Sequence, residues 1–433
     1  MRITAHKIHS IVTVPVFALA LLSAAALASA ASLKSDLHPD HDRRTPVVVF
    51  PAFHFTRLQV TVHNQTADPL CPSSGSFEDW FLNDHPSSVF SQVCQDEMLT
   101  LSLDPDTSKP ISRRFANPRG VDVRIKSFGR TESAPFYEPL YQFLEAHGYH
   151  RNQDIRVAGY DSRLTPDVDD FLPRTIALIE STYYDNHQTP VHLVGHSNGP
   201  LYAQYLLTHT SQAWKNKFVH GFTPFAGNWP GQGFFYAVNF TGFNVLGFTF
   251  PDNSANALSS ARMYQSHPSS YMSSADPAIF RDQEIVVDDL RSGKLYTPRD
   301  YKKLFQDAGL PVAGELARAY IGFVKFAKPS AFPNVDVYAE KGSGIDTAVG
   351  LKLQGLTVGQ VFPATDLSLY INRDGDVNQE DLTNDSIEVW ENMTCFHFEL
   401  NDNPGIDHFS LPGNSQVLQR LLAHLQRPKS NCS

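Results

Sequence analysis

Short apolar runs alternate with amphipathic stretches along the chain. An apolar run of about four to eight residues between turn residues indicates a buried strand, and apolar residues at helical intervals indicate a helix. The runs that predict strands are 46–51, 191–194, 218–225, 335–339 and 395–400. The stretches that predict helices are 137–147, 171–184, 201–208 and 416–425. This alternation predicts an α/β fold with a mostly parallel sheet.

The pattern weakens from about residue 231 to 328, where Ser, Asn, Pro and aromatic residues are frequent. Such a composition is typical of an insertion or cap rather than of sheet core. We therefore predict one domain over 46–425, with a surface loop at 71–94 and a cap insertion at about 231–328.

The first thirty residues differ from the rest. Arg2 and Lys7 precede an apolar run at 11–27, and small residues follow at Ala28 and Ala30, as in a signal-peptidase site. We interpret residues 1–30 as a secretory signal peptide that is cleaved near Ala30. The alternative is an uncleaved anchor, because the apolar run is close to the length of a membrane span.

Composition narrows the class of protein. The 433 residues are 42% apolar and 18% charged, which is typical of a globular chain. The net charge of −10 argues against a nucleic-acid partner, since a phosphate backbone binds basic surfaces. The even number of cysteines suits disulfides on a secretory route, and chain proximity favours pairing Cys71 with Cys94 and Cys395 with Cys432. N-glycosylation sequons begin at Asn64, Asn239, Asn384, Asn392 and Asn431.

A serine stands between two glycines in GHSNG at 195–199. The segment follows the predicted strand 191–194 and precedes the predicted helix 201–208. In that context the motif predicts a nucleophile elbow, a sharp strand-to-helix turn that exposes Ser197 and that flanking glycines make sterically possible. The motif alone would also occur by chance, but the strand and helix around it favour an α/β-hydrolase fold.

A serine nucleophile needs a base, and the base needs a carboxylate that holds its tautomer. In α/β-hydrolases the acid and then the histidine follow the serine along the chain. Asp376 follows an apolar run at 367–371 that could form a strand, and His408 follows the predicted strand 395–400. Both would lie at the edge of the sheet where such folds place their chemistry.

The DGD run at 374–376 has two other interpretations. Asp374 is an alternative acid. The run could also begin an EF-hand calcium loop at Asp374, but that interpretation fails, because Gln379 and Asp385 stand where glycine and glutamate are needed. The oxyanion hole would use the backbone N–H of Asn198 and one from the loop after the first strand, around Phe53.

With their neighbours, these motifs resemble the lecithin:cholesterol acyltransferase family over about 46–425. The matching segments are GVDVR at 120–124, FG at 128–129, GY at 148–149, DIR at 154–156, YDSR at 160–163, the elbow, QAWK at 212–215, DGD at 374–376 and GIDH at 405–408. Position by position, the resemblance implies Ser197 as nucleophile, Asp376 rather than Asp374 as acid, and His408 as base. It also implies that no metal and no organic cofactor is needed.

The loop between Cys71 and Cys94 has aromatic residues near its middle, which often reflect local packing. The family's lid is a disulfide-closed loop with a tryptophan that meets lipid. The resemblance therefore implies that Trp80 and Phe81 contact lipid.

The surroundings of the predicted site depart from the family pattern. After the first strand the family usually has proline-glycine and a second glycine, whereas this chain has PAFHF at 51–55. Instead of Gly-Ala-Pro-Trp-Gly-Gly it has AGNWPG at 226–231, and the loop after Asp376 continues with VN in place of glycine-threonine. The resemblance therefore does not fix the substrate.

The resemblance implies a secreted serine-dependent lipid O-acyltransferase. It would take an acyl chain from a phospholipid onto Ser197 and pass it to a sterol or another lipid alcohol, at a phospholipid membrane or lipoprotein surface. One alternative is a phospholipase A that releases free fatty acid. A second is a lipid-binding protein that kept the fold and lost turnover, which the altered loop around Phe53 would explain. Extracellular space and a lysosome or vacuole are the alternative destinations.

Overall fold

The computed structural model describes residues 44–65, 69–80, 89–168, 170–233, 235–242, 253–280, 284–326, 328–345, 348–359, 369–371, 387–391, 395–430 and 432. The predicted signal peptide at 1–30 lies outside the described residues. Three of the predicted site residues, Phe81, Asp374 and Asp376, also lie outside them.

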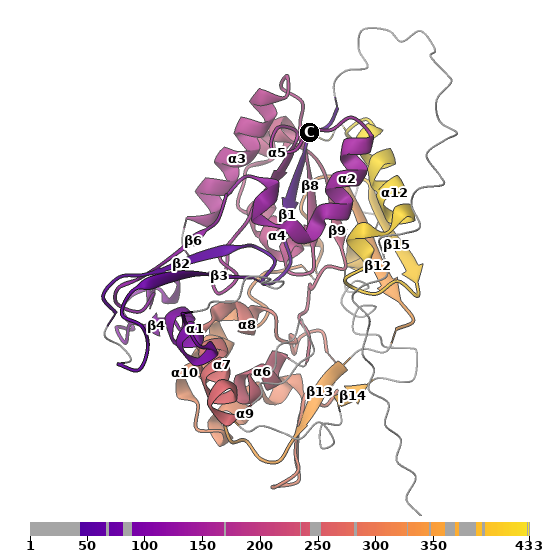
Figure 1. Ribbon diagram of the computed structural model, residues 1–433. Coiled ribbons are helices and arrows are strands. Elements are labelled where there is room, and N and C mark those ends of the chain that lie inside the picture. Colours follow the sequence, from indigo (N-terminus) through magenta and orange to yellow (C-terminus); the bar gives the residue numbers. More distant parts are fainter. Residues whose placement is uncertain are drawn as a thin grey trace, which may run out of the picture. The chain divides into compact units, whose positions relative to one another are not determined.

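A six-stranded sheet lies at the centre of the described chain (Figure 1). Its order is β15-β12-β9-β8-β1-β7, and every neighbouring pair is parallel. The strands are β1 Val47–Phe50, β7 Ile155–Val157, β8 Val191–His196, β9 Val219–Phe225, β12 Val337–Ser343 and β15 Phe398–Pro404. The predicted parallel α/β sheet is confirmed, and the carboxyl ends of its strands meet at one edge.

Helices cover both faces of this sheet. They are α2 Glu138–Ala146, α3 Phe171–Asp185, α4 Gly199–Thr208, α5 Gln212–Phe218 and α12 Ser415–Gln426. Successive residues of a strand point to opposite sides. Val47 and Val49 of β1 therefore cluster with α2 and α12, while Val48 and Phe50 cluster with α3 and α4. Burial on both faces explains why β1 is apolar throughout.

The segment 231–328 adds no strand to the parallel sheet among its described residues. It forms α6 Phe235–Thr241, α7 Ser254–Ser266, α8 Pro268–Met272, β10 Val287–Asp289, β11 Lys294–Tyr296, α9 Tyr301–Asp307 and α10 Pro311–Tyr320. This agrees with its weak strand pattern, and the limits of a cap domain stay a prediction.

A second sheet has the order β11-β10-β13-β14, in which β13 is Ala348–Leu353 and β14 is Leu369–Ile371. β14 is the strand predicted before Asp376. It pairs antiparallel with β13 and not with any strand of the parallel sheet. The expectation that this strand ends at the catalytic edge of the parallel sheet is therefore wrong.

The remaining described strands and one α-helix lie between β1 and α2 in the chain. They are β2 Leu58–Val62, β3 Gly75–Asp79, α1 Gln92–Leu99, β4 Ser102–Leu103, β5 Phe115–Ala116 and β6 Val121–Ile125. β3, β2 and β6 form an antiparallel sheet. The predicted loop 71–94 thus contains the strand β3, which pairs along the whole of β2, and the start of the helix α1.

Both favoured disulfides are present, Cys71–Cys94 and Cys395–Cys432. Of the sequon asparagines that the structure describes, Asn64 is exposed, whereas Asn239 is fully buried and donates its side-chain amide to the carbonyl of Phe235. A glycan has no room at Asn239 in the folded chain. Among the described residues, no helix combines the length and the apolar character needed to span a bilayer.

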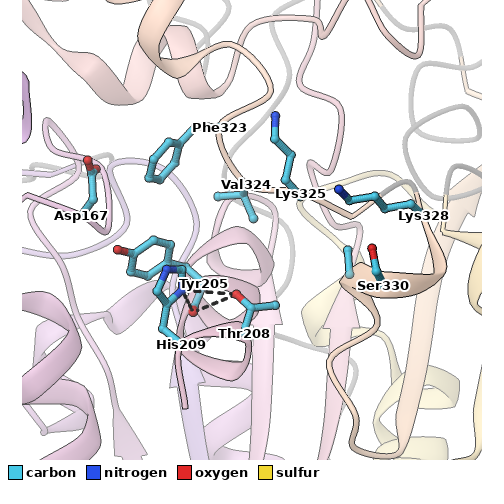
Figure 2. Close-up of a pocket in the computed structure, with 10 residues that line it drawn as sticks. Asp167, Tyr205, Thr208, His209, Phe323, Val324, Lys325, Lys328 and Ser330 are labelled. Carbon is cyan, nitrogen blue, oxygen red and sulfur yellow. Dashed lines mark hydrogen bonds between the residues drawn. The ribbon is translucent and has the colours of Figure 1, made fainter. Parts of the chain in front are cut away.

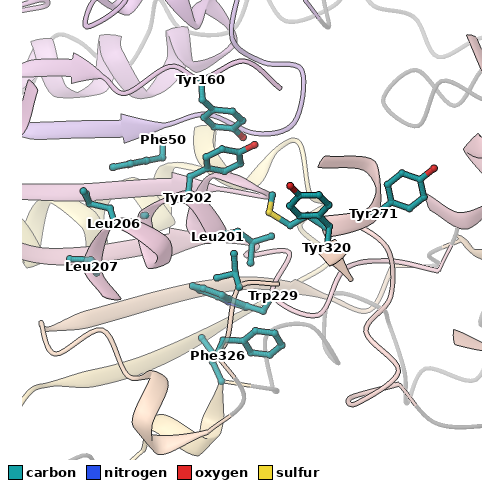
Figure 3. Packing of buried hydrophobic residues seen from close by; sticks show 14 of the residues in the cluster. Phe50, Tyr160, Leu201, Tyr202, Leu206, Leu207, Trp229, Tyr271, Tyr320 and Phe326 are labelled. Carbon is teal, nitrogen blue, oxygen red and sulfur yellow. The ribbon is translucent and has the colours of Figure 1, made fainter. Parts of the chain in front are cut away.

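One hydrophobic cluster extends from the parallel sheet into the segment 231–328 (Figure 3). Tyr160 and Tyr202 stack with ring centroids 3.6 Å apart. Tyr271 and Tyr320 from the segment 231–328 belong to the same cluster. Helix α4, which follows Ser197, contributes Leu201, Tyr202, Leu206 and Leu207 to this cluster.

Candidate active site

Ser197 lies in the turn between β8 and α4 and has a left-handed φ of 59°. Such a φ is costly for a residue with a side chain, so its surroundings must hold it. The Ser197 N–H donates to the carbonyl of Phe225 at 3.0 Å, and the Ser197 carbonyl accepts from the N–H of Asn228 at 2.8 Å. A strained, partly exposed serine at this turn is the geometry of a nucleophile elbow.

The space around the elbow requires its two glycines. A Cβ on Gly199 would lie 2.0 Å from the carbonyl oxygen of Phe50, and a Cβ on Gly195 would lie 2.8 Å from the nitrogen of Pro200. Both distances are below van der Waals contact with backbone atoms. Helix α4 can therefore start this close to β1 only because these positions lack a side chain.

Side chains from two other segments fix the residue after the serine. Asn198 Nδ2 donates to the hydroxyl of Ser273 at 2.6 Å, and Asn198 Oδ1 accepts from Nδ2 of Asn228 at 2.6 Å. Ser273 is the C-cap of α8, so the elbow is tied to the segment 231–328. The backbone N–H of Asn198 donates to no described residue, which suits an oxyanion donor.

The loop after β1 holds the other predicted oxyanion donor. The backbone N–H of Phe53 donates to no described residue, and its ring meets Phe235 of α6 edge-on at 5.5 Å. His54 follows with a φ of 61°, a conformation that glycine adopts more easily. The bulky residues that depart from the family pattern therefore bury this loop against α6.

His54 connects the oxyanion loop to the segment closed by the Cys71–Cys94 disulfide. Its Nδ1 lies 3.9 Å from the carboxylate of Asp79, the last residue of β3. Burial lowers the pKa of His54 and raises the pKa of Asp79. Both shifts favour the neutral forms, so this contact is weaker than an ordinary ion pair.

His408 lies half-buried in the turn after β15. The carboxylate of Asp407 accepts from the backbone N–H groups of Phe409 and Ser410, both at 2.9 Å, and so fixes the turn. The carbonyl of His408 accepts from His196 at 2.9 Å, and the two imidazole centroids are 4.8 Å apart. Because His196 directly precedes Ser197, the turn of the predicted base lies beside the elbow.

His196 and Tyr137 are site residues that the sequence did not indicate. His196 is fully buried at the end of β8, and its Nδ1 lies 3.1 Å from Tyr137 Oη. Burial lowers the pKa of His196 well below its usual value and raises that of Tyr137 well above. Tyr137 Oη also accepts from the N–H of Ala52 at 2.8 Å. A sequence signal for His196 is its place as a polar residue at the end of an apolar run. No such signal marks Tyr137.

The structure thus places the turn of His408 against His196, the residue before Ser197, and joins the loop of Phe53 to His196 through Tyr137. Asp376 and Phe81 lie outside the described residues. The catalytic roles and the lipid contact of Trp80 and Phe81 stay predictions. Trp80 is partly buried at the end of β3, with the guanidinium of Arg57 5.5 Å from its ring centroid.

A pocket of about 440 Å³ lies at the other end of α4 (Figure 2). Tyr205, Thr208 and His209 line it from below, and Lys325 and Lys328 come from the segment 231–328. Tyr205, the first lining residue on α4, comes eight residues after Ser197, about 12 Å along the helix. The pocket is therefore not where Ser197 would meet a substrate.

Comparisons with known proteins agree with this geometry. The family model described as Lecithin:cholesterol acyltransferase matches residues 115–307, which include the elbow. The protein "Lysosomal phospholipase A and acyltransferase" of Homo sapiens is 28% identical over 336 residues, covering 73% of this chain and 76% of that protein. "Phosphatidylcholine-sterol acyltransferase" of Gallus gallus is 28% identical over 310 residues, covering 69% of this chain and 71% of that protein.

Among solved structures, the one titled "The crystal structure of Tle4-Tli4 complex" aligns with a TM-score of 0.51. The alignment has 12% sequence identity and covers 89% of this chain and 99% of that chain. At that identity the likeness concerns the fold alone. Together with the parallel sheet and the family match, it confirms the predicted α/β-hydrolase fold.

Proposed function

We propose that this chain, which matches the lecithin:cholesterol acyltransferase family model over residues 115–307, is a secreted serine-dependent lipid O-acyltransferase. The chain is an enzyme of the lipid hydrolase and acyltransferase class. The finer proposal is that it moves an acyl chain from a phospholipid to a sterol or another lipid alcohol through an ester on Ser197.

In the first half of the reaction, His408 takes the proton of the Ser197 hydroxyl while the oxygen attacks the phospholipid ester carbonyl. Asp376 would hold the tautomer of His408 and stabilise the imidazolium. The backbone N–H groups of Phe53 and Asn198 would bind the oxygen that becomes negative. Collapse breaks the ester bond, and His408 returns the proton to the departing lysophospholipid oxygen.

In the second half, the acceptor takes the place of the lysophospholipid. Its hydroxyl gives a proton to His408 and attacks the acyl-enzyme, which releases the new ester and restores the Ser197 hydroxyl. A lipid alcohol and water compete for the same step. The outcome depends on how well the site excludes water and holds the alcohol.

The observation on which the proposal rests is the elbow itself. Ser197 has a φ of 59° between a buried strand and α4, and the turn of His408 is joined to the residue before it. Ser197 is half-buried, and the backbone N–H groups of Phe53 and Asn198 bond no described residue.

A phospholipase A is the second candidate, because the human relative's name includes both activities. A lipid-binding protein with little turnover is the third, since Ala52 and Phe53 replace the glycine pattern of the family. The retained Ser197 geometry favours the two enzymes over the third candidate.

We propose that the Cys71–Cys94 segment meets the phospholipid membrane or lipoprotein surface. Leu70 and Val89, near the two ends of that segment, are 89% and 59% exposed. Trp80 and Phe81 would add aromatic surface between them. The two disulfides fit a route through the secretory pathway to the extracellular space or a lysosome or vacuole.

The test uses the purified glycosylated chain on vesicles of phosphatidylcholine and cholesterol at neutral and acidic pH. Mass spectrometry follows sterol ester, free fatty acid and lysophospholipid. We expect sterol ester from the wild type, and a loss of at least about 10³-fold in Ser197→Ala. Ser102→Ala, an exposed serine of β4, is the matched control and should keep full activity.

The products separate the candidates. Free fatty acid without sterol ester would establish the phospholipase on these substrates. If neither product forms, a fluorophosphonate probe separates the enzyme from the lipid-binding candidate. Labelling that is lost in Ser197→Ala supports an enzyme, and absence of labelling in a protein whose urea transition shows that it is folded favours the lipid-binding candidate. Activity that survives in Ser197→Ala would overturn the proposed nucleophile.

A further inference from the structure

His196 forms hydrogen bonds in two directions that fix the position of its proton. Its Nε2 is 2.9 Å from the carbonyl oxygen of His408, which can only accept, so Nε2 must be protonated. The neutral ring then has a lone pair on Nδ1, 3.1 Å from Tyr137 Oη. Tyr137 must donate there. The buried surroundings of both groups agree, because burial disfavours imidazolium and phenolate alike.

Tyr137 also reaches the loop after β1. Its oxygen accepts from the N–H of Ala52 at 2.8 Å, and Ala52 directly precedes Phe53. The bonds therefore run in one direction, from Ala52 through Tyr137 and His196 to the carbonyl of His408. Hydrogen bonds aligned in this way polarise and strengthen one another. They join the proposed oxyanion loop to the turn of the proposed base.

A second tyrosine holds the same peptide group from its other side. The carbonyl of Pro51 and the N–H of Ala52 belong to one peptide plane, and Tyr160 Oη donates to that carbonyl at 2.6 Å. Tyr160 in turn stacks on Tyr202 of α4 at 3.6 Å. Tyr137 and Tyr160 thus fix the rotation of the peptide plane next to the one that includes the Phe53 N–H.

This arrangement suits a loop that lacks the family's glycines. The oxyanion donor must point at the developing charge, and a rotated peptide would aim it elsewhere. Tyr137, His196 and Tyr160 are each 1% exposed or less, so water does not replace these bonds readily.

We propose that Tyr137 and His196 are positioning residues that couple the oxyanion loop to the turn of the catalytic histidine, with Tyr160 as the clamp on the opposite side. The proposal rests on the proposed serine-dependent ester chemistry. Neither side chain is assigned a contact with the substrate. Their effect is on the turnover of the acyl-enzyme cycle and not on lipid recognition.

The experiment measures kcat and KM of the full glycosylated chain with p-nitrophenyl butyrate and p-nitrophenyl decanoate. Tyr137→Phe keeps the ring and removes both bonds of the hydroxyl. We expect kcat to fall by about 10- to 100-fold for both esters, a little less than the loss of a whole oxyanion donor, with KM nearly unchanged. The urea midpoint of each variant is measured alongside.

Tyr141→Phe is the matched control. Tyr141 lies on α2 and is fully buried like Tyr137, and its hydroxyl donates to the carbonyl of Ala134 at 3.0 Å, but it bonds neither active-site loop. It should lose stability like Tyr137→Phe and keep kcat. Equal losses of kcat in the two variants, or a normal kcat in Tyr137→Phe, would overturn the proposal.

His196 supplies a second variant if Tyr137→Phe does not fold. His196→Gln has an amide that can still donate to the carbonyl of His408, so it should retain more kcat than His196→Leu. Equal kcat in these two variants would contradict the coupling. If the folded wild type cleaves neither ester, the proposed function itself is wrong. The positioning role of these residues then has no reaction to act on.

Discussion

Two histidines of β8, His192 and His196, are four residues apart and therefore on the same face of the strand. Both are fully buried, and burial lowers the pKa of each well below its usual value. Each also uses both ring nitrogens. At the carboxyl end of the strand, His196 connects Tyr137 to the turn of His408.

At the amino end, His192 makes bonds of a different kind. Its Nδ1 is 3.1 Å from His220 Nδ1, and its Nε2 is 2.8 Å from the hydroxyl of Thr223. His220 Nε2 must donate to the carbonyl of Arg427 at 2.9 Å, so His220 Nδ1 accepts from His192. This network ends at Arg427, in the chain after α12, and bonds neither reaction loop. Residue type and burial are the same; the partners decide the role.

The largest difference in stability between the two ends of β8 is expected when a glycine beside each end is replaced by alanine. In Gly199→Ala the new Cβ would lie 2.0 Å from the carbonyl oxygen of Phe50, whereas in Gly221→Ala it would lie 3.1 Å from the ring of His192 and 3.2 Å from the carbonyl oxygen of Asp336. We expect Gly199→Ala to lose about 3 kcal/mol or more, because a backbone atom cannot move aside. Gly221→Ala should lose under about 1 kcal/mol.

Urea denaturation checks this prediction, and fluorophosphonate labelling reports the elbow. Gly199→Ala should show little labelling even where it folds. A Gly199→Ala variant with normal stability and labelling would mean that the elbow tolerates a shift of α4 away from β1.

Replacing the histidines themselves tests the comparison directly. His192→Leu leaves the buried Nδ1 of His220 and the hydroxyl of Thr223 without their partner, so we expect a loss of about 2–3 kcal/mol in the free energy of unfolding. The folded fraction should keep its kcat, in contrast to His196→Leu. Urea titration and p-nitrophenyl butyrate turnover are the measurements. A large fall of kcat in His192→Leu would make the two ends equivalent and break the comparison.

The sequence predicts the elements that these histidines connect, but not the connections. Continuous apolar runs predict β1 and β8, because strands buried on both faces contain few polar residues. GHSNG locates the elbow because only glycine fits beside Phe50 and Pro200. These are local requirements, and a local pattern can express them.

Contacts between distant residues have no such pattern. Tyr137 is 59 residues from His196 and 85 from Ala52 in the chain, and nothing near Tyr137 marks these partners. The strand before Asp376 was misplaced for the same reason. A short apolar run predicts a strand, but its partner in the second sheet, β13, is a tertiary choice.

Lowering the pH should reduce the free energy of unfolding through the buried histidine His424. His424 of α12 is 1% exposed and stacks on Tyr338 at 4.0 Å, and burial lowers its pKa from 6.5 to about 4. Below pH 6.5 the unfolded chain binds this proton and the folded chain does not until about pH 4. Stability is therefore lost across that window as the pH falls, by about 2 kcal/mol at pH 5.

Two variants separate the loss of stability due to His424 from the opposite effect of Asp96. Burial raises the pKa of Asp96 to about 6, so the folded chain takes up that proton before the unfolded chain and gains stability as the pH falls. His424→Gln should reduce the fall in stability between pH 7.5 and 5, and Asp96→Asn should enlarge it. Urea midpoints at both pH values measure the differences. An unchanged pH dependence in His424→Gln would contradict the assignment.

The smallest expected effect comes from one hydroxyl. Thr223→Val removes the donor to His192 Nε2 and keeps the shape of the side chain, so we expect a loss of about 1 kcal/mol with normal kcat. Thr175→Val is the control, because Thr175 is also fully buried and its hydroxyl has no hydrogen-bond partner among the described residues. That replacement should be neutral or stabilising, since it removes an unpaired polar group. If the two valine variants had the same urea midpoint, the Thr223 bond would contribute nothing, and His192 would be held by His220 alone.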